Sequence, residues 1–203
     1  ALADKGIWVA KKRYILNVHN NEGVQYDKPK LKIMGIEAIK SSTPASCRTK
    51  IIEALNLILR STETEVQEFI EQFRNEFKKL PVEDISFPRS VNGVSQYFDS
   101  KDIFKKGTPI HVRGALIFNH MLGKMNLEKK YQRIREGEKI KFVYLKEPNT
   151  FNSHVLSFLN SVPKEFDITS YIDYDTQFNK SFVEPLKLIL DKINWRVEKI
   201  STL

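Results

Sequence analysis

The first forty residues of the chain carry the apolar pattern of β-strands. Residues 7–18 run through β-branched and aromatic side chains, and the turn-forming sequence HNNEG follows at 19–23. In KLKIMGIE (30–37) apolar positions alternate with lysines, so one face of this strand is apolar and the other is basic. The pattern predicts a β-hairpin or short meander that covers roughly residues 7–37.

Helical periodicity follows the predicted strands. Ser42 or Thr43 is a suitable cap for a first helix, Pro44 suits its first turn, and isoleucine and leucine then recur at helical spacing. Thr62 and Glu65 have the spacing of a capping box, which predicts the start of a second helix. The two helices are expected to form an antiparallel hairpin.

The rest of the chain mixes irregular, helical and strand-like segments. Residues 81–107 are predicted to be irregular with short strand-like pieces, and a third helix is predicted over 108–123. Residues 139–148 alternate as a strand, and a long helical stripe covers 168–193, where Pro185 should introduce a kink. The fold class predicted from these patterns is α+β: an N-terminal β-hairpin or meander, then a mostly helical region with a few short strands.

Size and composition limit the classes of protein to consider. The chain has 203 residues, 41% of them hydrophobic, which suits one large domain or a small domain with part of another. No apolar run approaches the roughly 20 residues that cross a bilayer, and no signal peptide is recognisable, so no membrane partner is predicted. The first residue is Ala1, as expected for a piece of a longer chain. Cys47 is the single cysteine, which excludes a disulfide framework and favours a reducing compartment.

Positive charge is concentrated near the start of the sequence. The formal net charge is +8, and residues 1–50 hold ten Lys and Arg against four Asp and Glu. Such a surplus favours a polyanionic partner, with nucleic acid first and an anionic membrane second. The alternative is an ordinary solvated basic face.

The sequence offers no convincing active site. YIDYDT (171–176) spaces Asp173 and Asp175 like the metal-binding turn Y-x-D-T-D-S of family B DNA polymerases, but its surroundings are predicted to be helical. Side chains two apart on a helix diverge by about 200°, so this pair could not hold one metal pair. Phosphate loops, nucleophile elbows and zinc signatures are missing, and the histidines lack ligand spacing, so no metal site is predicted. Cys47 is interpreted as a small helix-packing residue.

Several motifs resemble the C-terminal palm and thumb region of family B DNA polymerases of T-even-like bacteriophages. They cover nearly the whole chain in the same order. These are KKRY (11–14), EGVQYDKPKLKIMGIEAIKSSTP (22–44), HVRGALIFNHML (111–122), GEKIKFVYL (137–145) and NKSFVEPLK (179–187).

The resemblance implies an architecture and a setting. Residues 1–37 would be the last strands of the palm, and residues 38–203 would be the thumb, which wraps the duplex behind the primer end. The fingers, the exonuclease and the catalytic aspartates would precede Ala1, so this part would be inactive alone. Mg²⁺ and the incoming dNTP would be bound by the complete enzyme, with no cofactor bound by this part. The site of action would be the cytoplasm of the infected bacterial host.

The resemblance also assigns roles to the KKRY residues. Lys12 and Tyr14 match residues that touch base edges in the minor groove near the primer terminus. That groove presents nearly the same acceptors for every correct base pair, so the contact tests pair shape without reading sequence. Lys11 and Arg13 would point to the other face of the strand and meet phosphates or palm carboxylates.

Contacts to the DNA backbone are predicted at helix starts. Hydroxyls and lysine precede Pro44, where free N–H groups and the helix dipole favour a phosphate, although ordinary capping is the alternative. KKGTPIHVRG (105–114) repeats this arrangement at the third helix. Lys180 matches a further lysine of the family's thumb. The nearby Glu184 departs from the family pattern, in which a basic residue can occur. The predicted backbone contacts are Lys11, Arg13, Lys40, Ser41, Ser42, Thr43, Lys105, Lys106, Arg113 and Lys180.

The predicted partners are primer–template DNA and the remainder of the polymerase, namely palm, fingers and exonuclease. Such polymerases usually end in an aromatic-rich peptide that binds the sliding clamp, but no aromatic residue follows Trp195. The clamp contact is therefore either missing or cut off. Two other functions stay open: a stand-alone accessory DNA-binding protein, and an interaction module whose basic face meets an acidic protein or a membrane.

Overall fold

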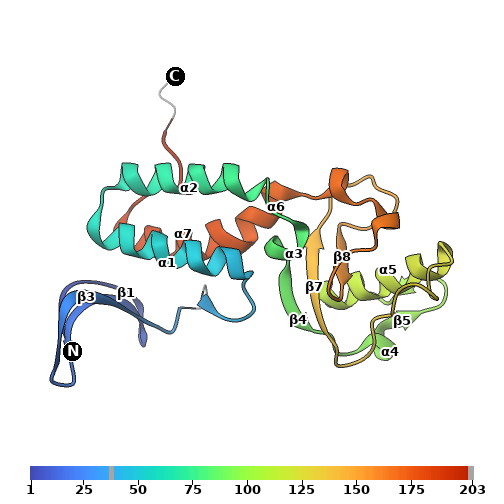
Figure 1. Ribbon diagram of the computed structural model, residues 1–203, viewed down its shortest axis with the longest axis horizontal. Coiled ribbons are helices and arrows are strands. Elements are labelled where there is room, and N and C mark those ends of the chain that lie inside the picture. Colours follow the sequence, from blue (N-terminus) through green and yellow to red (C-terminus); the bar gives the residue numbers. More distant parts are fainter. Residues whose placement is uncertain (37–38, 201–203) are drawn as a thin grey trace. The chain divides into compact units, whose positions relative to one another are not determined.

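The computed structural model describes residues 1–36 and 39–200, which form two compact units. The first unit comprises Ala1–Lys79 and Phe178–Leu203, and the second comprises Leu80–Gln177. Antiparallel strands at the N-terminus are followed by helices and a few short strands, which confirms the predicted α+β class (Figure 1). The boundary predicted between palm and thumb falls at residues 37 and 38, outside the described residues, and that division stays a prediction. Within the described ranges, no helix has the length and apolar character needed to cross a bilayer.

The N-terminal sheet of the first unit has three antiparallel strands in the order β1-β2-β3. The strands are β1 (Leu2–Ala10), β2 (Arg13–Asn21) and β3 (Val24–Met34). One face of the central strand is covered, because Ile15 is fully buried and the Asn17 side chain accepts a hydrogen bond of 3.1 Å from Arg60. The predicted meander is confirmed, with its second turn at residues 22–23.

Helices α1 (Ala45–Arg60) and α2 (Glu63–Phe77) follow the sheet and pack against each other, which confirms the predicted helix pair. The predicted capping box starts α2: the Glu65 backbone N–H donates to the Thr62 hydroxyl at 3.3 Å, and the Thr62 N–H donates to the Glu65 carboxylate at 3.2 Å. Four aromatic rings then join α2 to the C-terminal helical segment, with ring centroids 4.8–5.8 Å apart. They belong to Phe73, Phe77, Phe178 and Phe182. All four are buried, so this cluster is a main part of the core of the first unit.

The predicted helix over 168–193 is shorter and less regular than its apolar stripe indicated. Helix α6 (Tyr174–Phe178) passes into a π-helical turn (Asn179–Val183), then α7 (Glu184–Leu190) and a final 3₁₀ turn (Asp191–Ile193). The wider turn lies just before Pro185, which has no N–H to donate to a carbonyl of the preceding turn. Residues 168–173 lie outside the helix, and Ile172 instead forms an isolated bridge with Leu145.

The second unit is a three-stranded antiparallel sheet of order β4-β7-β8, with helix α5 packed on β8. The third helix and the strand predicted at 139–148 are both confirmed, although the strand ends at Tyr144. Short helices and a small hairpin occupy the region predicted to be irregular. The elements are α3 (Val82–Ile85), β4 (Phe87–Ser90), α4 (Val94–Tyr97), β5 (Phe98–Asp99), β6 (Ile103–Phe104), α5 (Ile110–Lys124), β7 (Lys139–Tyr144), β8 (Val155–Phe158) and 3₁₀ turns at Lys164–Phe166 and Thr169–Tyr171.

Candidate nucleic-acid interface

The KKRY motif forms a hairpin turn. Lys11 and Lys12 connect β1 to β2, and Ala10 pairs with Arg13 across the two strands. Lys12 adopts φ 63°, a left-handed conformation that is uncommon for residues other than glycine. The prediction of one strand through residues 7–18 is therefore wrong at this point. The pattern missed the turn because lysine is not a residue that usually signals one.

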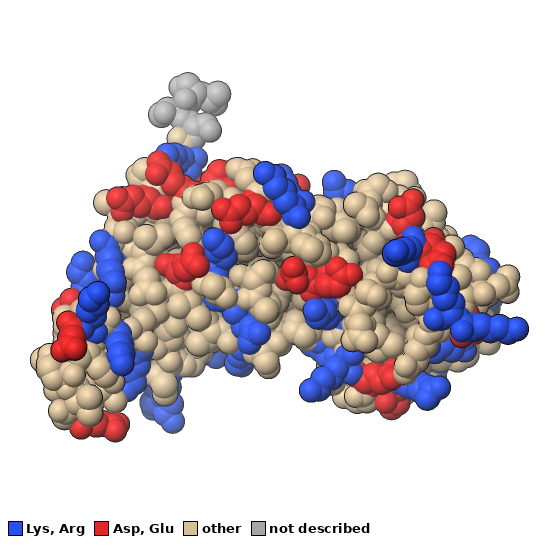
Figure 2. Space-filling model, in the orientation of Figure 1, with Lys and Arg blue, Asp and Glu red and all other residues tan. Residues whose placement is uncertain are grey.

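The turn is strongly basic. Lys11, Lys12 and Arg13 are all exposed, and none of the three forms an ion pair within residues 1–36 and 39–200. Figure 2 shows blue basic side chains gathered over the region of the N-terminal sheet, with fewer acidic ones between them. Three uncompensated cations on one short turn favour an anionic partner.

Tyr14 follows the turn on the central strand, where it is half-buried. It pairs with Trp8 of β1 and with Met34 of β3, so these three side chains share one face of the sheet. Lys12 lies at the tip of the hairpin, so the expected strand face shared by Lys12 and Tyr14 does not exist. Lys11 also lies in the turn, so the expectation that Lys11 and Arg13 share the opposite face of one strand is wrong as well.

The end of β3 packs directly against the turn. A side-chain Cβ at Gly35 would lie 2.4 Å from the carbonyl oxygen of Lys12 and 3.0 Å from Cγ of Arg13. Gly35 also has φ +65°, which a residue with a Cβ adopts at a cost. Glycine at this point of the KLKIMG sequence therefore lets the third strand support the basic turn.

The KSST segment forms a tight turn before α1. The Thr43 N–H donates to the Lys40 carbonyl at 3.0 Å. Lys40 and Ser41 are exposed and Ser42 is half-buried, whereas Thr43 is only 8% exposed. Pro44 is the N-cap residue and makes no side-chain cap bond, so the helix begins one residue later than predicted, at Ala45.

The start of α1 contacts the π-helical turn that carries Lys180. The Cys47 thiol lies 3.4 Å from the hydroxyl of Ser181, the residue after Lys180. Burial raises the pKa of Cys47, which favours the neutral thiol and fits its predicted packing role. The first unit thus places two predicted backbone-contact segments, 40–43 and Lys180, at neighbouring elements.

The KKGTP segment belongs to the second unit. Gly107 has φ +84° in the turn before α5, and the Thr108 hydroxyl donates to the Lys105 carbonyl at 2.6 Å. The Lys105 ammonium donates to the backbone carbonyl of Gln96 at 2.7 Å, so it has a structural role as well as a charge. Lys106 is exposed.

Arg113, in the first turns of α5, is held by an aromatic ring. Its guanidinium carbon lies 5.0 Å from the centroid of the Phe104 ring. Its Nε is buried and, within the described residues, has no hydrogen-bond partner. The guanidinium is therefore positioned by stacking, and its charge is not neutralised by an ion pair in the described part of the chain.

The two aspartates of YIDYDT have separate structural positions. Asp173 precedes α6, and its carboxylate accepts hydrogen bonds from the backbone N–H and the hydroxyl of Thr176, at 3.1 and 2.8 Å. Asp175 lies inside the first turn of α6. Asp173 is thus a helix-capping residue, which is a stabilising role and not a metal-binding one.

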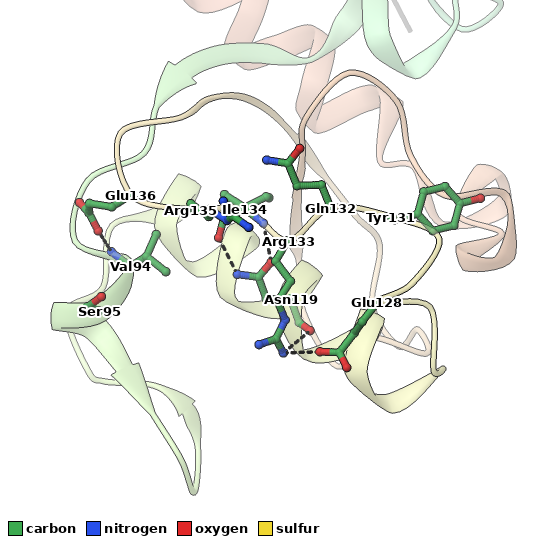
Figure 3. A pocket seen from close by; sticks show the side chains of 10 residues that line it. All are labelled: Val94, Ser95, Asn119, Glu128, Tyr131, Gln132, Arg133, Ile134, Arg135 and Glu136. Atoms are coloured by element: carbon green, nitrogen blue, oxygen red, sulfur yellow. Dashed lines mark hydrogen bonds and ion pairs between the residues drawn. The ribbon is translucent and has the colours of Figure 1, made fainter.

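Sequence reasoning missed a cleft of about 490 Å³ in the second unit (Figure 3). The Asn119 side chain accepts from the Ile134 N–H at 2.8 Å and donates to the Ile134 carbonyl at 2.9 Å. Arg133 pairs with Glu128 at 2.9 Å, and the Glu136 carboxylate accepts from the N–H of Val94 at 2.8 Å. These contacts anchor the loop after α5 to α5 and α4. The sequence pattern did not reveal the cleft, because its hydrogen bonds join residues far apart in the sequence, such as Val94 with Glu136.

The comparisons with known proteins cover most of the chain. No family model matches it. The DNA-directed DNA polymerase of Enterobacteria phage T4 is 35% identical over 185 residues, which is 89% of this chain and 20% of that protein. The DNA-directed DNA polymerase of Escherichia phage RB69 is 32% identical over 187 residues, which is 90% of this chain and 20% of that protein.

The chain spans about one fifth of the length of the curated relatives it matches. The chain is therefore related to the DNA-directed DNA polymerases of T-even-like bacteriophages and corresponds to a segment of those proteins.

Proposed function

We propose that this chain supplies the part of a phage replicative DNA polymerase that holds the primer–template duplex. The observation that carries the proposal is the exposed basic turn at Lys11–Arg13, which forms no ion pair with the described residues, in a chain related to two phage polymerases. Nucleotidyl transfer, with its catalytic aspartates, Mg²⁺ and dNTP, belongs to the remaining parts of the enzyme. Those parts and the duplex are the proposed partners, and the infected host's cytoplasm is the proposed location.

The hairpin tip suits a check of the minor groove. This groove is about 6 Å wide, so it admits side chains and excludes a two-stranded hairpin. Lys12 at the tip can extend its ammonium group towards purine N3 and pyrimidine O2, and Tyr14 can bring its hydroxyl to the same edge. Correct pairs of any sequence present these acceptors at similar positions, so the contact senses pair geometry.

The backbone grip is assigned to the remaining basic groups of each unit. In the first unit these are Lys11 and Arg13 of the turn, Lys40 to Thr43 before α1, and Lys180. Because Thr43 is almost fully buried, the exposed Lys40 and Ser41 are the better candidates for a phosphate there. In the second unit they are Lys105, Lys106 and Arg113. Phosphate contacts of this kind position a protein without reading sequence.

Salt titration of duplex binding tests the proposal. The affinity for a short primer–template duplex should fall linearly with the logarithm of salt concentration, with a slope that corresponds to several released counterions. Fluorescence anisotropy of a labelled duplex measures this slope. An affinity that does not change between low and high salt rules out phosphate contact and favours the interaction module instead.

Lys12→Ala is expected to weaken primer extension more than Lys180→Ala when each change is made in the complete polymerase. Both substitutions remove one positive charge from an exposed lysine. Only the first removes a donor proposed to act at the primer end, whereas the second removes a contact to the backbone. Single-turnover extension on a matched primer measures the difference. Equal losses from the two variants refute the minor-groove role of Lys12.

A further inference from the structure

A row of large side chains crosses the N-terminal sheet beside the basic turn. Trp8, Tyr14 and Met34 lie opposite one another on β1, β2 and β3. Trp8 is 64% exposed and Met34 is 45% exposed, which is unusual for side chains of this size. The row is one residue pair away from the Ala10–Arg13 pair that closes the turn.

The indole of Trp8 is held in a defined position. Its ring centroid lies 6.2 Å from that of Tyr14, with an angle of 35° between the rings. A Cβ at Gly6 would lie 2.8 Å from Cζ3 of Trp8 and 2.5 Å from Cδ2 of Leu16. The absence of a side chain at Gly6 therefore lets the indole lie close to the sheet, next to the tyrosine.

The other face of the same sheet is already occupied. Ile7, Ile15 and Ile33 lie opposite one another there, and Ile15 has no exposed surface. Asn17, two residues along from Ile15, is bound to Arg60 of α1. Trp8, Tyr14 and Met34 thus belong to the opposite face, where Trp8 and Met34 are exposed.

We propose that Trp8 is a further DNA-contacting residue, whose indole packs on the deoxyribose wall of the minor groove beside the base pair that Tyr14 touches. The inference rests on the proposed function, because a sheet that presents Tyr14 to the groove must also present Trp8. The walls of the groove are apolar sugar edges bordered by phosphates. An apolar row next to the exposed cations Lys11, Lys12 and Arg13 is complementary to both.

Tryptophan fluorescence provides a direct test. The chain has two tryptophans, Trp8 and Trp195, so Trp195→Phe leaves Trp8 as the single reporter. Acrylamide quenching of this protein is measured with and without a short primer–template duplex. The quenching constant of Trp8 should fall severalfold when the duplex is bound, because the groove wall covers the indole.

The salt dependence of binding separates an apolar contact from a charged one. Trp8→Ala should weaken duplex binding between about fivefold and a hundredfold, the usual range for an aromatic contact to nucleic acid. It should leave the salt slope unchanged, whereas Lys11→Ala, at a proposed phosphate contact, should reduce the slope by about 1. Leu2→Ala is the matched control, because Leu2 is a 67% exposed apolar residue at the other end of β1. Amide exchange of β2 in each variant verifies that the sheet is intact.

The possible results are distinct. A duplex that binds with the expected salt slope while Trp8 stays as open to acrylamide as in the free protein overturns the inference and leaves the proposed function standing. Protection of Trp8 that rises with protein concentration in the absence of DNA assigns this face to a second copy of the chain and also overturns it. Failure of the duplex to bind at all removes the proposed function and the inference together.

Discussion

Gly114→Ala is expected to destabilise the second unit by about 2 kcal/mol, although alanine is the better helix former. In a helix interior the exchange alone would stabilise by roughly 1 kcal/mol. Here a Cβ at residue 114 would lie 2.4 Å from the Ser157 hydroxyl, 2.6 Å from the Ser157 backbone nitrogen and 3.0 Å from the Leu156 carbonyl carbon. Two of these three atoms belong to the backbone of β8, so the strand or the helix has to move.

The movement would also disturb a hydrogen bond between the two elements. The Ser157 hydroxyl donates to the backbone carbonyl of His111 at 2.7 Å, one turn before Gly114 on α5. Overpacking a close contact usually costs about 1–3 kcal/mol, and a lost hydrogen bond costs about 1 kcal/mol more. Together these effects exceed the gain in helix propensity.

Gly123→Ala in the same helix is the matched control. A Cβ at Gly123 would meet Arg133 and Glu128 side-chain atoms at 3.7 Å, which is ordinary contact. This variant should be as stable as the original protein or slightly more stable. Thermal unfolding and amide exchange of β7 measure both variants, and each kcal/mol corresponds to roughly 4–8 °C for a unit of this size. If both alanines stabilise the protein, the close approach of α5 to β8 is refuted.

The sequence predicted those parts of the fold that local chemistry determines. The Thr62 and Glu65 capping box and the strand predicted at 139–148 need only neighbouring residues. The box is confirmed, and so is the strand as far as Tyr144. The turn at Lys11–Lys12 could not be predicted in the same way. Its left-handed Lys12 depends on the pairing of β1 with β2 and on the support from Gly35, which are contacts between distant residues.

The sequence likewise predicted only part of the candidate site, namely its basic segments and not their contacts. The charge pattern located the basic segments, and the exposed turn at Lys11–Arg13 is one of them. The pattern did not show that Lys105 binds the Gln96 carbonyl or that Thr43 is buried, because both depend on how loops fold back. Trp8 was not predicted as a candidate, because it lies beside Tyr14 only through the pairing of β1 with β2.

Gln177→Leu is expected to destabilise the second unit by about 2–4 kcal/mol. The Gln177 side chain has no exposed surface, and it hydrogen-bonds to one backbone group of β7 and one of α3. Its amide oxygen accepts from the Tyr144 N–H at 3.1 Å, and its amide nitrogen donates to the Ile85 carbonyl at 2.5 Å. Leucine has nearly the same volume but can satisfy neither group. The loss of a hydrogen bond to a buried backbone group costs about 1–3 kcal/mol.

Gln132→Leu separates this effect from the general cost of removing an amide. The Gln132 side chain also makes one hydrogen bond, to Glu138 at 2.7 Å, but it is exposed, and water can replace that bond. Its loss should change stability by less than about 0.5 kcal/mol. Denaturant unfolding compares the two variants, and amide exchange of Tyr144 reports the broken contact directly. Equal stabilities of the two variants would mean that water replaces the hydrogen bonds of Gln177 to Tyr144 and Ile85. The Gln177 side chain would then not be needed to satisfy these two backbone groups.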